Sequence, residues 1–299
     1  MQIAVRDFGG SGSGLVLIHG LSRTLVDWSL LAPLLAARHH VVAMDVRGHG
    51  RSSDGPWSWA AAVADVDTVI GQVGLKRPAV MGHSLGGMIA TLWGREHPEA
   101  SGVVNLDGHG NPRPEQYLGL DPDYVAERRA ELEALQKQQL AALGGPLSTG
   151  QVEALTAQQR AIAPRLGAPE DLFVEGLQRM LEVSAGGVRL RPAPDGYAAE
   201  IYASLDEVDM FAAYRELRCP LLLFSAVAAE PGAIPGPPWL GGLMSAFRKG
   251  QTRDLEEVAA ERPNVRLETL AGAHGLLFEQ PEAIAQATLD FLDGTIRRS

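Results

Sequence analysis

The chain has 299 residues, of which 45% are hydrophobic and 21% charged, a composition typical of globular proteins. Its net charge of −10 and its pI near 5.3 argue against nucleic acid or an anionic membrane as the main partner. A single cysteine, Cys219, excludes an internal disulfide framework. The N-terminus lacks a signal-peptide pattern and no apolar run has the length of a membrane span, so we expect a cytoplasmic protein.

Short apolar runs alternate with helical patterns over the first 110 residues. The strand-like runs lie at residues 2–5, 15–18, 40–44, 78–81 and 102–106, and helical spacing occurs at 27–37, 57–73 and 87–96. Continuous apolar runs such as Leu15-Val16-Leu17-Ile18 are typical of strands that are buried on both faces. This alternation predicts an α/β fold with a mostly parallel sheet flanked by helices.

The middle of the chain has a different character. Gln-, Glu-, Ala- and Leu-rich segments, broken by proline and glycine, lie at residues 123–143, 150–166 and 169–183, without a buried-strand pattern. Strand patterns return at 221–224 and 264–269, and a helical pattern closes the chain at 276–292. We therefore expect residues 1–110 and 216–299 to form the core domain, with residues 111–215 inserted as a helical cap.

The stretch Gly82-His83-Ser84-Leu85-Gly86 joins an apolar strand to a helix. A serine in such a tight turn takes strained backbone angles, and glycines on either side remove side chains that would collide. The turn also places the serine at a helix N-terminus, where negative charge is stabilised. We therefore predict that Ser84 is a catalytic nucleophile.

A serine nucleophile needs a base and donors for the negative charge that develops on the substrate oxygen. Of the eight histidines, His274 is the best placed, because it follows the last strand and parallel strands end at one edge of the sheet. The N–H groups of Leu21 and Leu85 are the expected oxyanion donors. The histidine spacings do not match a metal site, and we expect neither a metal nor a cofactor.

Four motifs follow one another in the order of a known superfamily. They are His19-Gly20, the Asp45–Ser52 segment DVRGHGRS, the serine turn Gly82–Gly87, and Gly272-Ala273-His274. The chain resembles the α/β-hydrolase superfamily, in particular its single-chain esterase, lactonase and haloperoxidase-like group. The resemblance covers residues 1–110 and 216–299 and implies an α/β-hydrolase fold with a cap. It assigns the Asp45–Ser52 segment mainly a structural role.

The acid that orients His274 is where the chain departs from the usual family pattern. The family most often places an aspartate after the strand that follows the cap, but this chain has alanines there and a late Glu230. The superfamily also uses the strand end after the nucleophile helix, where this chain has Asp107. We expect Asp107 to be the acid, with Glu230 as the alternative and the cap carboxylates Asp206 and Asp209 behind it.

These residues predict a hydrolase that cleaves an ester or lactone of a small, fairly hydrophobic molecule through an acyl-enzyme. Alternatives are a β-diketone carbon–carbon bond hydrolase, a cofactor-free perhydrolase or haloperoxidase, and a ligand-binding protein on a hydrolase fold. We expect a monomer or homodimer without nucleic-acid or membrane partners. The expected substrate-binding residues are Gly20, Ser22, Trp28, Trp57 and His83.

Overall fold

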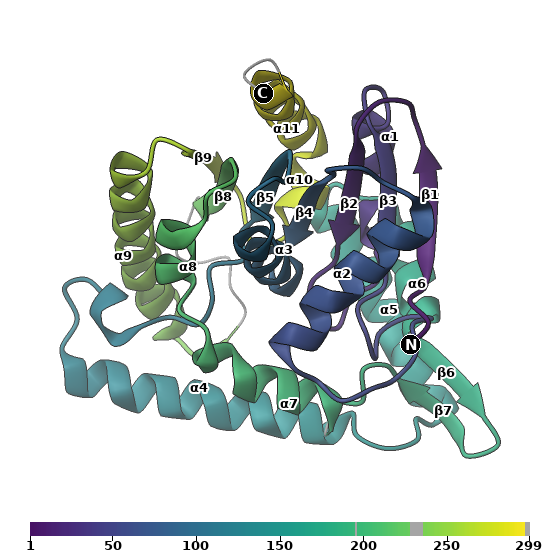
Figure 1. Cartoon of the computed structure of the whole chain (residues 1–299). Helices are drawn as coiled ribbons and strands as arrows, with labels where there is room; N and C mark the ends of the chain where they lie inside the picture. The colour runs from purple at the N-terminus through teal and green to yellow at the C-terminus, as the bar shows by residue number, and fades with distance from the viewer. Residues whose placement is uncertain (195, 228–235, 297–299) are drawn as a thin grey trace.

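A central sheet organises the computed structural model, which describes residues 1–194, 196–227 and 236–296 (Figure 1). Within these residues seven strands pair in the order β1-β3-β2-β4-β5-β8-β9. Their bounds are β1 Val5–Gly9, β2 Gly14–Ile18, β3 His40–Met44, β4 Ala79–His83, β5 Gly102–Leu106, β8 Leu221–Val227 and β9 Val265–Ala271. Only β1 runs antiparallel to its neighbour among these strands, so the predicted mostly parallel sheet is confirmed.

Helices cover both faces of the sheet because successive side chains of each strand point to opposite sides. Val16 and Ile18 of β2 belong to one buried apolar cluster, whereas Leu15 and Leu17 belong to the other. The first cluster includes side chains from α2 (Trp59–Val73), α3 (Leu85–Glu96), α8 (Met210–Glu216) and α9 (Leu240–Glu261). The second includes side chains from η1 (Leu25–Ser29), α1 (Ala32–Leu35), α10 (Leu276–Glu279) and α11 (Pro281–Ile296).

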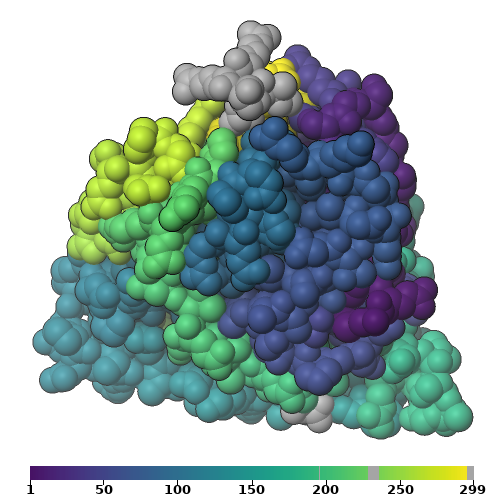
Figure 2. All heavy atoms as spheres, viewed as in Figure 1, coloured from purple at the N-terminus to yellow at the C-terminus, as the bar shows by residue number. Residues whose placement is uncertain are grey.

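The chain between residues 111 and 209 forms a layer along one end of the sheet (Figures 1 and 2). In Figure 2 its teal and green atoms occupy the lower edge of the molecule. Its elements are η2 Pro114–Gln116, α4 Pro122–Ala142, α5 Thr149–Ile162, η3 Ala163–Leu166, α6 Glu170–Met180, β6 Leu181–Ser184, β7 Gly187–Leu190, α7 Tyr197–Ser204 and η4 Leu205–Glu207.

Two features of this layer differ from the expected helical cap. The helical pattern predicted through residue 183 ends at Met180, and an antiparallel hairpin, β6 with β7, follows it. The hairpin is largely exposed, so it lacks the buried apolar run by which a strand is recognised in sequence. In addition, α8 contributes Met210, Phe211 and Tyr214 to a core cluster, so the core begins again before residue 216.

Within the described residues, no helix combines the length and the apolar character that a membrane span requires.

Candidate active site

Ser84 lies at the junction of β4 and α3, in a backbone conformation that few side chains adopt. Its φ is 54° and its ψ is −121°, and its N–H donates to the carbonyl oxygen of Leu106 at 3.0 Å. A Cβ atom on Gly82 would lie 1.9 Å from the carbonyl oxygen of Gly86, and one on Gly86 would lie 2.1 Å from that of Ile18. The turn therefore requires both glycines, and it leaves Ser84 partly exposed at the start of α3.

Asp107 follows β5 and directs its carboxylate to the same edge of the sheet. Its side chain is fully buried, and His274 Nδ1–H donates to its Oδ2 at 2.6 Å. Since an ionised carboxylate only accepts hydrogen bonds, Nδ1 of His274 carries the proton in this bond, and Nε2 is the ring nitrogen that Asp107 does not occupy. The His274 side chain is half exposed, so this free nitrogen can reach a bound molecule.

Within the described residues, two further groups donate hydrogen bonds to the Asp107 carboxylate. The N–H of Ala226 donates to Oδ1 at 3.1 Å, and Arg248 of α9 donates to Oδ1 and Oδ2 at 3.2 and 3.3 Å. Burial by itself would raise the pKa of Asp107, but the hydrogen bond from His274 and the charge of Arg248 outweigh it and hold that pKa well below its usual range. The carboxylate is therefore ionised at neutral pH.

Asn105 fixes the turn that carries Asp107. It is fully buried in β5, where its Oδ1 accepts the Gly108 N–H at 2.8 Å and its Nδ2 donates to the Gly108 carbonyl at 2.9 Å. A Cβ on Gly108 would lie 2.2 Å from the carbonyl oxygen of Ser84, so the two turns are in direct contact. A lone polar residue inside a buried apolar strand was the sequence signal for this role.

The other candidate acids do not contact His274 in the described part of the chain. Asp206 accepts a hydrogen bond from Asn111 at 2.9 Å, and Asp209 pairs with Arg113 and caps α8. Glu230 lies outside the described residues.

The expected oxyanion donors lie on either side of the serine. Leu85 is the first residue of α3, and Leu21 lies in the loop after β2. Within the described residues neither N–H has a hydrogen-bond acceptor, so both are free to bind an oxygen atom. A Cβ on Gly20 would lie 3.2 Å from Cβ of Ser84, which shows how closely the loop approaches the nucleophile.

Two buried histidines hold the Gly20–Ser22 loop. Nδ1–H of His19 donates to the Gly20 carbonyl at 2.7 Å, and its Nε2 accepts the Val46 N–H at 3.0 Å. Nε2 of His49 accepts the Ser22 N–H at 3.2 Å, at a residue whose φ is 55°. Burial lowers the pKa of both histidines, that of His49 to about 3, so they are neutral and act as fixed supports.

His83, the residue before Ser84, holds the loop that carries His274. Its Nε2–H donates to the carbonyl oxygen of His274 at 2.7 Å, and the two rings lie 4.8 Å apart. The N–H of Ala273 also donates to Glu279 at 3.0 Å. No hydrogen bond joins Ser84 Oγ to His274 within the described residues; in such pairs this contact commonly tightens when the substrate binds.

Ser84 and His274 both line a cavity of about 260 Å³. The other residues that line it are Gly20, Leu21, Arg23, His83, Gln159, Ile162, Leu166, Phe173, Gly275 and Phe278. Three of these, Gln159, Ile162 and Phe173, belong to α5 and α6, so the inserted layer forms one wall. The cavity therefore combines the reactive groups with a mainly apolar wall.

Of the five expected substrate-binding residues, Gly20 and His83 line this cavity, and the other three do not. Ser22 lies in the adjacent loop and is held by His49. Trp28 was a wrong prediction, because its side chain is fully buried in the core beside η1. Trp57 instead donates from Nε1 to Ser204 Oγ at 2.8 Å. Large aromatic side chains bury so much area that the core is their usual place.

Arg23 lines the cavity, although no motif in the sequence points to it. Its Nε and Nη2 donate to the Asp27 carboxylate at 2.7 Å, and its guanidinium lies 5.1 and 5.3 Å from the rings of Phe173 and Phe278. Phe173 belongs to the inserted layer, whereas Phe278 belongs to the core. Arg23 therefore links the two at the mouth of the reactive centre.

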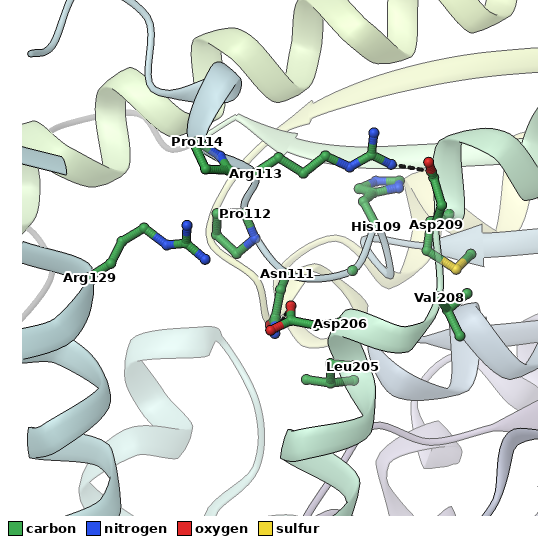
Figure 3. A pocket seen from close by; sticks show the side chains of 12 residues that line it. His109, Asn111, Pro112, Arg113, Pro114, Arg129, Leu205, Asp206, Val208 and Asp209 are labelled. Atoms are coloured by element: carbon green, nitrogen blue, oxygen red, sulfur yellow. Dashed lines mark hydrogen bonds and ion pairs between the residues drawn. The ribbon is translucent and has the colours of Figure 1, made fainter. Parts of the chain in front are cut away.

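Another cavity, of about 390 Å³, lies beside the loop after Asp107 and is shown in Figure 3. It is lined by His109–Pro114, Arg129 of α4 and residues 205, 206 and 208–210, and neither Ser84 nor His274 reaches it. In Figure 3 the Arg129 side chain points toward this space, and Arg113 pairs with Asp209 across it. The reactive groups therefore belong to the smaller cavity.

The described residues contain no group of three or more His, Cys, Asp or Glu side chains that could hold a metal ion. The chemistry that this arrangement supports is nucleophilic attack by a serine, assisted by an imidazole and an ionised carboxylate.

Comparisons with known proteins give the wider context. The profile of the "Alpha/beta hydrolase family" matches residues 15–287. The chain is 34% identical to a fluoroacetate dehalogenase from Burkholderia sp. over 95% of this chain and 88% of that protein, and 27% identical to the putative carbamate hydrolase RutD from Caulobacter sp. (strain K31) over 94% and 90%. The crystal structure of E-2-(acetamidomethylene)succinate hydrolase superposes with a TM-score of 0.70 at 20% identity, covering 97% of this chain and 95% of the other.

Proposed function

The chain belongs to the alpha/beta hydrolase family, and from that premise we propose that it is a serine hydrolase that cleaves a carboxylic ester or lactone through an acyl-enzyme intermediate. The observation that carries the proposal is the 2.6 Å hydrogen bond from His274 to the buried Asp107, in a loop that opens on the same cavity as Ser84.

In the proposed reaction, Ser84 Oγ attacks the substrate carbonyl while Nε2 of His274 takes its proton. The charge on the carbonyl oxygen is stabilised by the N–H groups of Leu21 and Leu85. His274 then gives its proton to the leaving oxygen, and Asp107 stabilises the imidazolium in between. A water molecule that is activated by His274 releases the acid and restores the serine.

The cavity supports a small substrate with an apolar part. Its volume of about 260 Å³ is just below the roughly 300–1,000 Å³ of pockets for drug-sized ligands. Ile162, Leu166, Phe173 and Phe278 supply apolar wall, and Gln159 is a polar group on the same side. An acyl group of a few carbon atoms, open or closed into a lactone ring, fits this lining.

A carbamate or amide is the second candidate substrate, because the relative that is 27% identical is called a putative carbamate hydrolase. The same serine and histidine could attack a carbamate carbonyl. We rank it second because an alkoxide leaves more readily than an amide nitrogen.

Carbon–fluorine cleavage is not proposed, although the relative with 34% identity is a fluoroacetate dehalogenase. Dehalogenases of this superfamily use a carboxylate nucleophile, whose ester intermediate water can hydrolyse. Attack by Ser84 on a carbon–halogen bond would form an ether, from which water does not regenerate the enzyme. We therefore expect no catalytic release of fluoride from fluoroacetate, as measured with a fluoride electrode.

The test is hydrolysis of p-nitrophenyl esters from acetate to octanoate by the wild type and by matched variants, with circular dichroism to check folding. We expect Ser84→Ala and Asp107→Asn each to lower kcat/KM by roughly 10⁴-fold. Asp206→Asn, which changes a carboxylate outside the site, should retain the activity. Glu230→Gln should also retain it, because Asp107 is the acid.

Other outcomes would select other functions. If Glu230→Gln abolishes activity while Asp107→Asn does not, the acid assignment is wrong. Activity on a β-diketone without activity on esters would indicate a carbon–carbon bond hydrolase, and peroxide-dependent halogenation would indicate a perhydrolase. If a fluorophosphonate probe fails to label Ser84 in folded protein, the serine is not activated and the ligand-binding hypothesis gains support.

A further inference from the structure

Arg248 makes a two-point contact with the buried carboxylate that bonds His274. It lies on α9, 141 residues from Asp107, and its Nη1 and Nη2 donate to Oδ1 and Oδ2 of that carboxylate at 3.2 and 3.3 Å. Gln251, which is itself buried, accepts a hydrogen bond from Nη1 at 2.8 Å and so fixes the guanidinium from one turn further along the helix. The Arg248 side chain is only 20% exposed.

This arrangement differs from a carboxylate that faces the imidazole alone. Oδ2 of Asp107 accepts both from His274 and from Arg248, while Oδ1 accepts from Ala226 and from Arg248. The fork fixes the plane of the carboxylate, and therefore the direction of the bond to His274. A positive charge on the far side of the carboxylate also opposes the positive charge that His274 acquires during the reaction.

We propose that Arg248 is a positioning residue that acts on His274 through Asp107, fixing the carboxylate and keeping the imidazole neutral and ready to accept a proton at lower pH. This inference rests on the proposed function, because it assumes that His274 is the base and Asp107 its partner. It adds a charged group, from a helix outside the inserted layer, to the three residues that the sequence predicted, Ser84, His274 and Asp107.

Other groups also face the His274 loop and stay unchanged in the test. His83 of β4 donates to the His274 carbonyl, and Glu279 of α10 accepts from the N–H of Ala273. His109, after β5, has its Nε2 3.9 Å from Asp107 Oδ1. Burial holds the pKa of His83 at about 3 and that of His109 at about 4, so neither changes charge near neutral pH.

The experiment measures the acid limb of the kcat/KM profile for a p-nitrophenyl ester, which reports the pKa of the base in the free enzyme. Arg248→Met removes the positive charge, so the acid limb of the kcat/KM profile should shift to a pH about one unit higher. Arg248→Gln, neutral but still a hydrogen-bond donor, should show the same shift and serves if the methionine variant folds poorly. Arg248→Lys keeps the charge and should keep the limb within about 0.3 unit of the wild type.

Arg253→Met is the matched control. Arg253 lies on the same helix and pairs with a carboxylate, that of Asp254, and no contact joins it to Asp107 or His274 within the described residues. The acid limb of the kcat/KM profile of Arg253→Met should lie at the same pH as that of the wild type. If Arg248→Met and Arg248→Gln also keep the wild-type limb, Arg248 stabilises the fold only and the inference is overturned.

A second readout separates this inference from the proposed function. The titration of His274 can be followed by NMR of its ring protons, which requires no substrate. If no ester is hydrolysed, the proposed function fails, but a higher His274 pKa in Arg248→Met still supports the charge coupling. If esters are hydrolysed and Asp107→Asn is inactive, while the His274 pKa is the same with and without Arg248, only the Arg248 inference fails.

Discussion

Three of the buried histidines, His49, His83 and His109, should make the protein acid-sensitive well above the range in which its carboxylates titrate. Burial lowers the pKa of His49 and of His83 from 6.5 to about 3, and that of His109 to about 4. The hydrogen bonds of each of these rings require only one N–H, as in a neutral imidazole. His109, for example, bonds the Tyr214 hydroxyl at 2.8 Å and donates to the Phe224 carbonyl at 2.9 Å. Protonation in the folded state would place a charge in the core.

The sign follows from which state binds the proton. The unfolded chain takes up a proton at each of these histidines below about pH 6.5, whereas the folded chain does not until its lower pKa is reached. Their contribution to stability is therefore complete above pH 6.5 and is lost as the pH falls. As the pH falls from 8 to 5, each histidine should lower the free energy of unfolding by about 2 kcal/mol, and the three together by about 6 kcal/mol. The whole stability of a domain is roughly 5–15 kcal/mol, so most of it could be lost.

The assay is urea unfolding followed by circular dichroism at pH 8, 7, 6 and 5. The wild-type free energy of unfolding should fall by about 6 kcal/mol across the series. His109→Gln should reduce this fall by about 2 kcal/mol, whatever its stability at pH 8, because one titrating group has been removed. A wild-type free energy that is level from pH 8 to pH 5, or a His109→Gln series parallel to it, would refute the reasoning.

Three further predictions concern the turn, the core and the cavity. Gly86→Ala should destabilise the fold by more than about 3 kcal/mol in urea unfolding, because its Cβ would lie 2.1 Å from a carbonyl oxygen of β2. The control is Gly71→Ala in α2, where a Cβ has no neighbour within 4 Å; this variant should be as stable as the wild type or more stable. Arg47→Met should cost about 3–5 kcal/mol in the same assay, because it leaves Asp65 buried without the guanidinium that now bonds it at 2.7 and 2.9 Å. Leu166→Trp should fill the cavity and lower kcat/KM for hexanoate at least roughly tenfold more than for acetate; equal losses would show that Leu166 does not contact the acyl chain.

The positions of the strands along the chain and the turn around Ser84 could be predicted from sequence because both depend on local patterns. Apolar runs identify strands that are buried on both faces, and Gly82 avoids a clash with an atom only four residues away, because its Cβ would lie 1.9 Å from the Gly86 carbonyl oxygen. The sequence also favoured Asp107 over Glu230 from its place at a strand end. The structure adds the 2.6 Å bond to His274, a contact across 167 residues.

What the sequence did not show is mostly long-range or weakly patterned. The hairpin β6–β7 is exposed, so it has no apolar alternation strong enough to compete with the helical pattern before it. Trp28 is one of the large aromatic residues that are candidates for an apolar substrate pocket when only the sequence is considered. The sequence does not show which way the Trp28 ring points from η1. In the structure the ring is buried in the core, where large aromatic side chains usually lie.

Arg248 shows most clearly why a site is harder to predict than a fold. It lies in a helix with many charged residues, and in the sequence it resembles any solvated arginine. Its role arises only because the parallel sheet brings β5 beside β8 and packs α9 over that edge, so that a guanidinium meets a carboxylate with no exposed surface. The position of a carboxylate at a strand end allows its bond to a histidine to be predicted from sequence. The positive charge that pairs with this carboxylate comes from whichever helix packs against the strand end, and the sequence does not show which helix that is. The proposed effect of Arg248 on His274 is therefore a property of the tertiary structure and not of the motif.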